Sequence, residues 1–353
     1  MKIGSSLIGI DEPTYFVADI AANHDGNINR AIELIHRCAE AGANAAKFQN
    51  FKASTIVSDY GFKSLQKVSS HQSGWKDSVY QVYDQASISL EWTQQLKEAC
   101  ENDNIDYFTA PYDLDIIDYL DDFVSAWKVG SGDINWLDLI ENLAQRGKPL
   151  LIATGASSLE DVRAAIKISS QHSSQIVLMQ CNTNYTGSLE NLKHVNLSVL
   201  STYSDLFPGM ILGLSDHTPG HSTVLGAIAL GARVIEKHFT DDTSRNGPDH
   251  KFSMNPDSWR EMVVRSRELE SALGDGVKKV EDNESETFVI QRRALRAAKD
   301  LPAGTILNKS NVVALRPCPA EGLGPNRANI LIGRLLSRPL VKGEIIGIED
   351  LST

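Results

Sequence analysis

The chain has 353 residues, of which 42% are hydrophobic and 22% are charged, a composition typical of a globular protein. It holds no run of about 20 apolar residues and no basic start followed by an apolar core, so we expect neither a transmembrane helix nor a signal peptide. The net charge of -11 argues against non-specific nucleic-acid binding, which needs a basic face, although a few lysines focused in a cleft could still bind an anion.

The four cysteines are Cys38, Cys100, Cys181 and Cys318, which are scattered along the chain and form no C-x-x-C pair. We interpret them as reduced thiols in a reducing compartment. Together with the absence of a targeting segment, this predicts a cytoplasmic protein.

Eight short apolar runs alternate with longer amphipathic stretches over the first three quarters of the chain. Each run is short enough to be a strand and apolar enough to be buried on both faces, which is typical of a parallel sheet. The runs are 15–21, 45–49, 106–110, 126–129, 150–153, 176–180, 211–214 and 234–237.

The stretches between these runs predict helices, and several have recognisable ends. Ser89, Ser158 and Asn255 stand at N-cap positions, while Gly42 and Gly274 stand where helices should end. The clearest helices are 29–41, 89–102, 158–169 and 255–273. Eight strands alternating with helices predict a (β/α)8 TIM barrel over residues 1–274.

Two segments do not fit a simple barrel. Residues 55–90 are longer than a barrel connection needs, and we expect them to form either a lid or an interface. Residues 275–286 are polar and predict a linker, after which 287–353 predict a small, mainly β domain. Its predicted strands are 294–298, 312–315 and 334–340. At roughly 65 residues this domain is marginal alone, so we expect it to lean on another surface.

Polar side chains follow nearly every predicted strand, where a barrel enzyme carries its chemistry. They are Asp19, Asn23, His24, Lys47, Gln49, Thr109, Tyr112, Lys128, Ser131, Asp133, Thr154, Gln180, Asn182, Tyr185, Ser215, Asp216, His217, Glu236 and His238. Lys47 and Lys128 would be costly to bury without anionic partners. Either each forms an ion pair with a local carboxylate, or both bind the phosphate and carboxylate of a small anion.

His217 and His238 stand at the ends of adjacent strands, which lie about 4.8 Å apart. Taken singly, each could be a hydrogen-bonded barrel histidine, but together they favour a shared metal, with Mn²⁺ preferred and Mg²⁺ or Fe²⁺ possible. His24 lies in a turn and could serve the turn or catalysis. Gly130-Ser131-Gly132 is a weak phosphate signal that Lys128 makes plausible.

Several strings occur in the order typical of one family: ANHDGN, KVGSGD, GLSDHT, EKHFT and GPDHKFSMNP. With them, nearly the whole chain resembles the sialic acid synthase (N-acetylneuraminate synthase) family. RALRAAKD and LRP, near the end, resemble its C-terminal antifreeze-like (SAF) domain. The pair GLSDHT and EKHFT is the most specific.

The resemblance implies a domain-swapped homodimer, in which the small domain of one subunit caps the barrel of the other. It implies metal ligation by His217 and His238, and catalytic roles for these residues and for Asp19 and Asp133. The implied phosphoenolpyruvate contacts are Lys47, Lys128, Ser131 and Ser215, and the implied sugar contacts are Gln49, Thr183, Tyr185, Asp249 and, from the partner, Arg316.

The implied reaction condenses phosphoenolpyruvate with an N-acylated amino sugar of the N-acetylmannosamine type and releases phosphate by C–O cleavage, giving a nine-carbon acid. Asp19 and Asp133 replace family glutamates, Ala110 replaces a threonine and Thr183 replaces an asparagine. The identity of the sugar substrate therefore stays open. A 2,4-diacetamido-trideoxyhexose, leading to a legionaminic-type acid, is the alternative, and a phosphorylated sugar is a further one. Outside this reaction, the chain could be another metal-dependent barrel lyase or aldolase, or a non-catalytic carbohydrate-binding protein.

Overall fold

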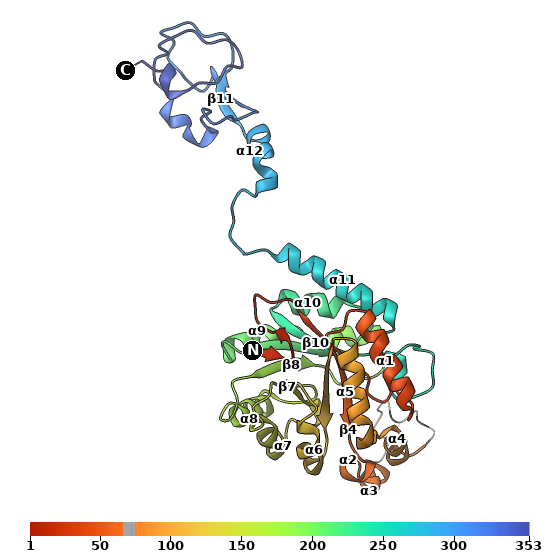
Figure 1. Ribbon diagram of the computed structural model, residues 1–353. Coiled ribbons are helices and arrows are strands. Elements are labelled where there is room, and N and C mark those ends of the chain that lie inside the picture. The colour runs from red at the N-terminus through yellow and green to blue at the C-terminus, as the bar shows by residue number, and fades with distance from the viewer. Residues whose placement is uncertain (66–71, 73–74, 76, 353) are drawn as a thin grey trace. The chain divides into compact units, whose positions relative to one another are not determined.

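The computed structural model describes residues 1–65, 72, 75 and 77–352 (Figure 1). The chain divides into two compact units, Met1–Gly274 and Asp275–Thr353, which are described one at a time. Among the described residues, no helix is long and apolar enough to cross a membrane. All four cysteines lie among the described residues and are free thiols, as predicted.

Eight parallel strands close into a barrel in the first unit, in the order β10-β3-β4-β5-β6-β7-β8-β9. Their bounds are β3 Tyr15–Asp19, β4 Ala45–Asn50, β5 Asp106–Pro111, β6 Trp127–Val129, β7 Leu150–Ala153, β8 Ile176–Cys181, β9 Ile211–Asp216 and β10 Ala232–His238. All eight predicted strands are therefore confirmed. The first ends earlier than predicted because Ala21 has a positive φ of 45°, which starts a turn.

Helices surround the strands on the outside of the barrel (Figure 1). They are α1 Ile28–Glu40, α5 Thr93–Asn102, α6 Ile117–Asp121, α7 Leu137–Ala144, α8 Leu159–Ser169, α9 Val199–Leu206, α10 Ser222–Ala229 and α11 Pro256–Leu273. The predicted caps hold: Ser158 accepts from the backbone of Asp161, and Asn255 accepts from that of Ser258. Gly42 follows the last turn of α1 with a φ of 97°, a conformation that suits glycine.

A short N-terminal hairpin lies at the end of the barrel where the strands begin. Its strands, β1 Lys2–Ile3 and β2 Ser6–Leu7, are too short to give a periodic pattern, and we did not expect them. Ile3 and Ile8 are buried in the barrel core. Gly4 packs against Asp106, the first residue of β5, which puts the hairpin at the N-terminal ends of the strands.

The long connection after β4 forms three short helices in its described part. They are α2 Ala53–Ile56, α3 Asp59–Ser64 and α4 Val79–Ala86. Ser78 and Gln81 form a capping box that begins α4. Residues 66–71, 73, 74 and 76 of the predicted lid or interface segment lie outside the described residues.

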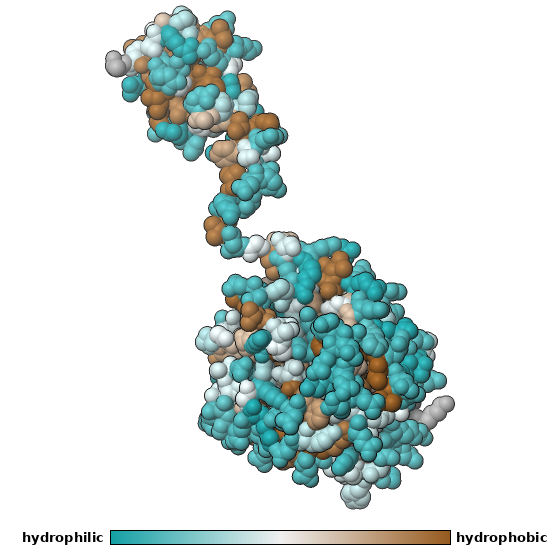
Figure 2. Space-filling model, in the orientation of Figure 1, coloured by the Kyte–Doolittle hydropathy of each residue, from teal (hydrophilic) through white to brown (hydrophobic). Residues whose placement is uncertain are grey.

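The second unit contains helix α12 Ser285–Gln291 and an antiparallel pair, β11 Ala294–Ala297 and β12 Val312–Leu315. The segment 334–340, predicted as a third strand, makes only isolated bridges, because Leu335, Leu336 and Leu340 pair with three separate segments. A small leucine-rich core holds the unit together. Hydrophobic side chains stay exposed along α12, including Phe288, Val289 and Ile290 (Figure 2).

Gly213 on β9 tests how tightly the barrel is packed. A Cβ there would lie 2.7 Å from the carbonyl oxygen of Val234 and 2.9 Å from a side-chain carbon of Met179. We therefore expect Gly213→Ala to lower the free energy of unfolding by about 1–3 kcal/mol. Chemical denaturation measures this, with Gly132→Ala, which has nothing within 4 Å, as the matched control. Equal midpoints for both variants would contradict the prediction.

Candidate active site

A cavity of about 380 Å³ opens at the C-terminal ends of the barrel strands, where parallel strands bring their last residues together. Of the thirteen residues with a predicted catalytic, binding or metal role, eleven line it: Asp19, Lys47, Gln49, Lys128, Ser131, Asp133, Tyr185, Ser215, His217, His238 and Asp249. Thr183 is not among the lining residues. Arg316 lies in the second unit, directly after β12, where its side chain is exposed.

Two lysines and two carboxylates form a buried charge cluster at the bottom of the cavity. Lys47 Nζ lies 2.7 Å from Asp19 Oδ2 and 3.5 Å from Glu236 Oε1. Lys128 Nζ lies 3.1 Å from the same Glu236 oxygen, which also accepts a hydrogen bond from Ser215 Oγ at 3.1 Å. The lysines are thus ion-paired, as the first of our two interpretations expected, and they also face the cavity.

The cluster fixes the charge state of its members. Burial alone would raise the pKa of Asp19, but Lys47 and His238 outweigh it and lower that pKa to about 2. Burial likewise opposes ionisation of Glu236, yet the two lysines lower its pKa. Burial would lower the pKa of Lys47, but Asp19 and Glu236 raise it. These three groups are therefore charged at neutral pH.

Glu236 was expected among the polar residues at the strand ends, but no catalytic or binding role was predicted for it. It stands two positions before His238 on β10, so strand alternation alone places both side chains on the inner face. Lys237, between them, points the other way and pairs with Asp216 and the carbonyl of Thr218. Within the described part of the chain, Oε2 of Glu236 is buried without a hydrogen-bond partner.

The two predicted metal ligands lie side by side. The rings of His217 and His238 are 5.3 Å apart, centre to centre, and both are buried. His217 Nδ1 donates to the carbonyl of Asn182 at 3.0 Å, which leaves Nε2 for a ligand. Burial lowers the pKa of both imidazoles, that of His238 to about 3, so both are neutral. Neutral imidazole is the form that binds metals.

The donor set around these histidines fits a metal site only in part. Asp19 Oδ2 lies 3.6 Å from His238 Nε2, and His238 Nδ1 has no partner among the described residues. In that part of the chain, no three His, Cys, Asp or Glu side chains are grouped to hold an ion. Two imidazoles could still hold one whose other positions go to substrate and water. Metal binding therefore stays a prediction.

Aromatic rings fix the orientation of the two imidazoles. Tyr185 packs edge-on against His217 at 4.4 Å, and Phe252 packs edge-on against His238 at 4.9 Å, between ring centres. Phe252 lies in the GPDHKFSMNP string, and we did not predict a role for it. Edge-on rings restrict rotation of the imidazoles, so the ring nitrogens of both histidines are held in position before any ligand binds.

Two carboxylates at the mouth differ from those of the charge cluster. Burial raises the pKa of Asp133 and of Asp249 to about 6 each. Asp249 Oδ2 accepts a hydrogen bond from the backbone of Ala22 at 3.0 Å. Near neutral pH these two carboxylates can therefore take up or release protons.

The turn before Asp133 also packs closely at the mouth. Gly130 approaches Tyr112 so closely that a Cβ on Gly130 would lie 2.9 Å from the tyrosine hydroxyl.

His24, for which a role in the turn or in catalysis was expected, has a structural role in the turn. Its Nδ1 accepts from the backbone of Gly26 at 3.1 Å, and its ring packs edge-on against Trp92 at 5.7 Å. It does not line the cavity.

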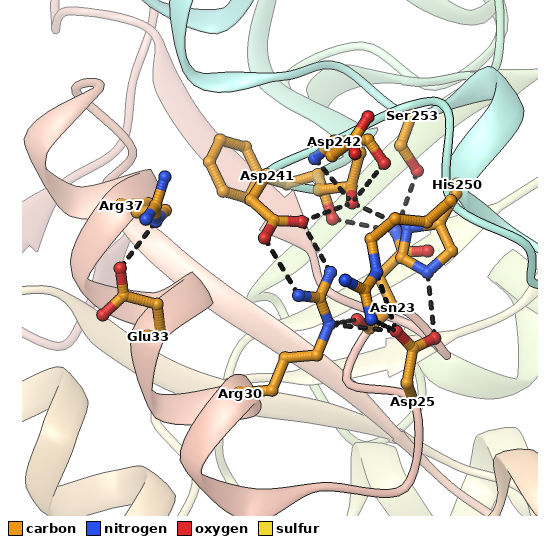
Figure 3. Close-up of polar contacts among 12 residues, drawn as sticks. Asn23, Asp25, Arg30, Glu33, Arg37, Asp241, Asp242, His250 and Ser253 are labelled. Carbon is orange, nitrogen blue, oxygen red and sulfur yellow. Dashed lines mark hydrogen bonds and ion pairs between the residues drawn. The ribbon is translucent and has the colours of Figure 1, made fainter.

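A polar clamp joins the loop after β3 to the segment after β10 (Figure 3). Asp25 accepts from the fully buried His250 at 2.9 Å and pairs with Arg245 at 2.6 Å and Arg30 at 3.1 Å. Arg30 also forms a two-point ion pair with Asp241. Because Asp249 precedes His250 directly, the clamp also holds Asp249 at the mouth.

The NeuB family matches residues 34–278 of this chain. The chain belongs to the NeuB family. The SAF domain matches residues 292–352, so both predicted resemblances are confirmed. This NeuB-family chain is 34% identical to the N,N'-diacetyllegionaminic acid synthase of Legionella pneumophila, over 93% of this chain and 92% of that one. It is 30% identical to a pseudaminic acid synthase of Campylobacter jejuni, over 99% of each.

A solved structure agrees with these relatives of the NeuB-family chain. The crystal structure of N-acetylneuraminic acid synthetase from Leptospira borgpetersenii, in complex with citrate, superimposes with a TM-score of 0.71 at 27% identity. The match covers 81% of this chain and 94% of the other. The fold of this chain is thus that of the family, and its small domain is the part that matches the SAF domain.

Asp133→Asn should stabilise the protein above pH 6. The folded-state pKa of about 6 exceeds the ordinary 3.8, so proton binding stabilises the fold at low pH, and this stability is lost as the pH rises through 6. The variant lacks this loss, which amounts to about 2 kcal/mol. The Tm of Asp133→Asn should rise relative to that of the wild type as the pH increases from 4 to 7.5. The Tm of Asp205→Asn, at an exposed position on α9, should not. A constant difference across this range would argue against the raised pKa.

Proposed function

We propose that this protein condenses phosphoenolpyruvate with an N-acylated amino sugar of the N-acetylmannosamine type, forming a nine-carbon sialic-type acid and releasing phosphate. Its relatives in the NeuB family are named as synthases of such acids, and membership of that family makes the chain an enzyme of this class. The observation that carries the proposal is the convergence of two buried lysines and two neutral imidazoles on one cavity.

The lysines supply the binding site for phosphoenolpyruvate. Each ammonium group has three donors, and the ion pairs with Asp19 and Glu236 hold Lys47 and Lys128 at the cavity without using all of them. Ser131 and Ser215 add hydroxyls that line the same space. The phosphate and carboxylate of the substrate would therefore meet donors that are already oriented.

His217 and His238 would hold a divalent metal ion, with Mn²⁺ preferred and Mg²⁺ or Fe²⁺ as alternatives. A bound metal would supply Lewis-acid polarisation of the sugar aldehyde. Burial keeps both imidazoles neutral, and Tyr185 and Phe252 hold their rings in place. These features support metal binding without fixing which metal is used.

The remaining residues account for the charge and proton changes. When C3 of phosphoenolpyruvate attacks the aldehyde carbon, positive charge develops at C2, and the ionised Asp19 and Glu236 would stabilise it. Water then adds at C2, and cleavage of the C–O bond releases phosphate. Asp133 or Asp249 could accept and return the protons, because burial raises their pKa values to about 6.

The shorter carboxylates do not break the site. Asp19 still lies 2.7 Å from Lys47 and accepts a hydrogen bond from Gln49 at 3.0 Å, and Asp133 still lines the cavity. A non-catalytic carbohydrate-binding role has no observation in its favour. The match to the SAF domain favours the synthase over another barrel lyase or aldolase. The cytoplasmic location and the exclusion of nucleic-acid partners stay predictions.

A homodimer in which Arg316 of one subunit reaches the barrel of the other completes the proposal. Arg316 is exposed at the end of β12, a suitable position for an interaction between subunits. The exposed Phe288, Val289 and Ile290 of α12 supply apolar surface that a second subunit could cover. Both features support the dimer.

The test of the reaction is phosphate release from phosphoenolpyruvate with a panel of acylated hexosamines, with the product identified by mass spectrometry. We expect release only when both substrates are present. His217→Ala should lose bound metal, measured by elemental analysis, and fall at least 10³-fold in kcat, because one of two imidazole ligands is gone. A His217→Ala variant that stays active after chelation would refute the metal role.

Mixing two inactive variants tests whether Arg316 acts across the dimer. Lys47→Met disables the barrel site, and Arg316→Ala disables the contribution of the small domain. If the small domains are exchanged, each mixed dimer has one intact site, so refolded mixtures should recover about a quarter of wild-type activity. Each variant refolded alone is the control. No recovery in dimers shown to be mixed would refute the exchange.

A further inference from the structure

We propose that the buried ion pair between Asp216 and Lys237 positions the imidazoles of His217 and His238, although neither member of the pair lines the cavity. Asp216 directly precedes His217 in the chain, and Lys237 directly precedes His238. Both would act through the histidines, so they are positioning residues and not catalytic ones. The inference rests on the proposed function in one respect, that the two histidines serve the reaction.

The ion pair joins two neighbouring strands just before the histidines. Asp216 ends β9 and lies opposite Lys237 of β10 in the barrel register. Ser215 and Glu236 form the preceding pair in this register; they line the cavity and hydrogen-bond to each other at 3.1 Å. Because side chains alternate along a strand, Asp216 and Lys237 point to the other face of the sheet. The two strand ends are therefore tied together on both faces.

The ion pair also holds the residue that follows His217. The carboxylate of Asp216 accepts hydrogen bonds from the backbone N–H of Thr218 at 3.1 Å and from its hydroxyl at 2.9 Å. Lys237 Nζ donates to the carbonyl of Thr218 at 2.6 Å. Thr223, in the first turn of α10, donates its hydroxyl to the same carboxylate at 2.7 Å. Since His217 lies between Asp216 and Thr218, its backbone is held on both sides.

His238 has fewer direct contacts of its own than His217. The ring of His217 donates from Nδ1 to the carbonyl of Asn182 at 3.0 Å. By contrast, His238 Nδ1 has no hydrogen-bond partner among the described residues, and its Nε2 lies 3.6 Å from Asp19. Packing against Phe252 restricts the ring but does not fix the strand that carries it. The position of His238 therefore depends on the end of β10, which the ion pair holds against β9.

Stability of the fold is a weak reason for this ion pair. Both side chains are almost completely buried, and replacing such a pair by apolar residues is often neutral or stabilising. A pair that fixes the separation of two strand ends has a geometric role that apolar side chains would not fill. The rings of the two histidines lie 5.3 Å apart, centre to centre, directly beyond this pair.

The experiment compares Lys237→Met with Lys148→Met. The control breaks the 3.2 Å pair between Lys148 and Asp121, which lies before β7 at the other end of the barrel. In metal-free protein with isotopically labelled histidine, Lys237→Met should shift or broaden the NMR signals of both site imidazoles, and Lys148→Met should not. Mn²⁺, titrated alone by calorimetry, should bind about 10- to 100-fold more weakly to Lys237→Met than to the control.

Two further variants guard against a failure to fold, since Lys237→Met leaves Asp216 buried and unpaired. The double variant Asp216→Asn/Lys237→Met removes both charges, and we expect it to change the same signals. Thr223→Val keeps both charges and removes only one hydroxyl donor to Asp216, so any change that it causes comes from geometry. We expect Thr223→Val to act in the same direction but less strongly. Circular dichroism shows which variants are folded.

Two results would overturn the inference: unchanged imidazole signals in the folded double variant and in Thr223→Val, and an Mn²⁺ affinity in the double variant equal to that of Lys148→Met. Failure of the proposed function is a separate outcome, in which the wild type neither binds Mn²⁺ nor releases phosphate. The imidazole signals of the metal-free variants then decide alone. Changed signals support positioning by the ion pair, and unchanged signals reject it.

Discussion

Two buried ammonium groups shared between two buried carboxylates hold the centre of this active site together. Lys47 and Lys128 come from β4 and β6, whereas Asp19 and Glu236 come from β3 and β10, the first and last strands of the barrel. Leaving one such buried charge unpaired costs about 3–5 kcal/mol. The cluster can therefore form only when the barrel has closed, and closure in turn places the lysines for an anion.

The polar clamp, outside the cavity, depends on closure of the barrel in the same way. Asp25 and Arg30 follow β3, whereas Asp241 and His250 follow β10, so the pairs between them span the same closing seam. Residues separated by more than two hundred positions thus fix one edge of the mouth, and Asp249 is held next to that edge. The candidate site is therefore preorganised by long-range pairing between the strand ends and the loops that follow them.

The sequence predicted the barrel because buried parallel strands are continuous apolar runs, and it predicted most of the cavity because those strands all end at one face. A role for Glu236 could have been inferred from the strand alternation that places its side chain on the same face as that of His238. The contribution of Phe51 and Val82 to the cavity could not, because a long connection has to fold back before both residues reach it. Thr183 was chosen from family position alone, and it does not line the cavity.

The two sides of the cavity are under different constraints. Changing the charge cluster leaves a buried ion unpaired, so substitutions in the part that we propose to bind phosphoenolpyruvate should cost much stability. Ile56 and Val82 line the cavity from the connection after β4, where side chains can change without disturbing the barrel. On this argument, substitutions in the connection after β4 should cost less stability than substitutions of Lys47 or Glu236.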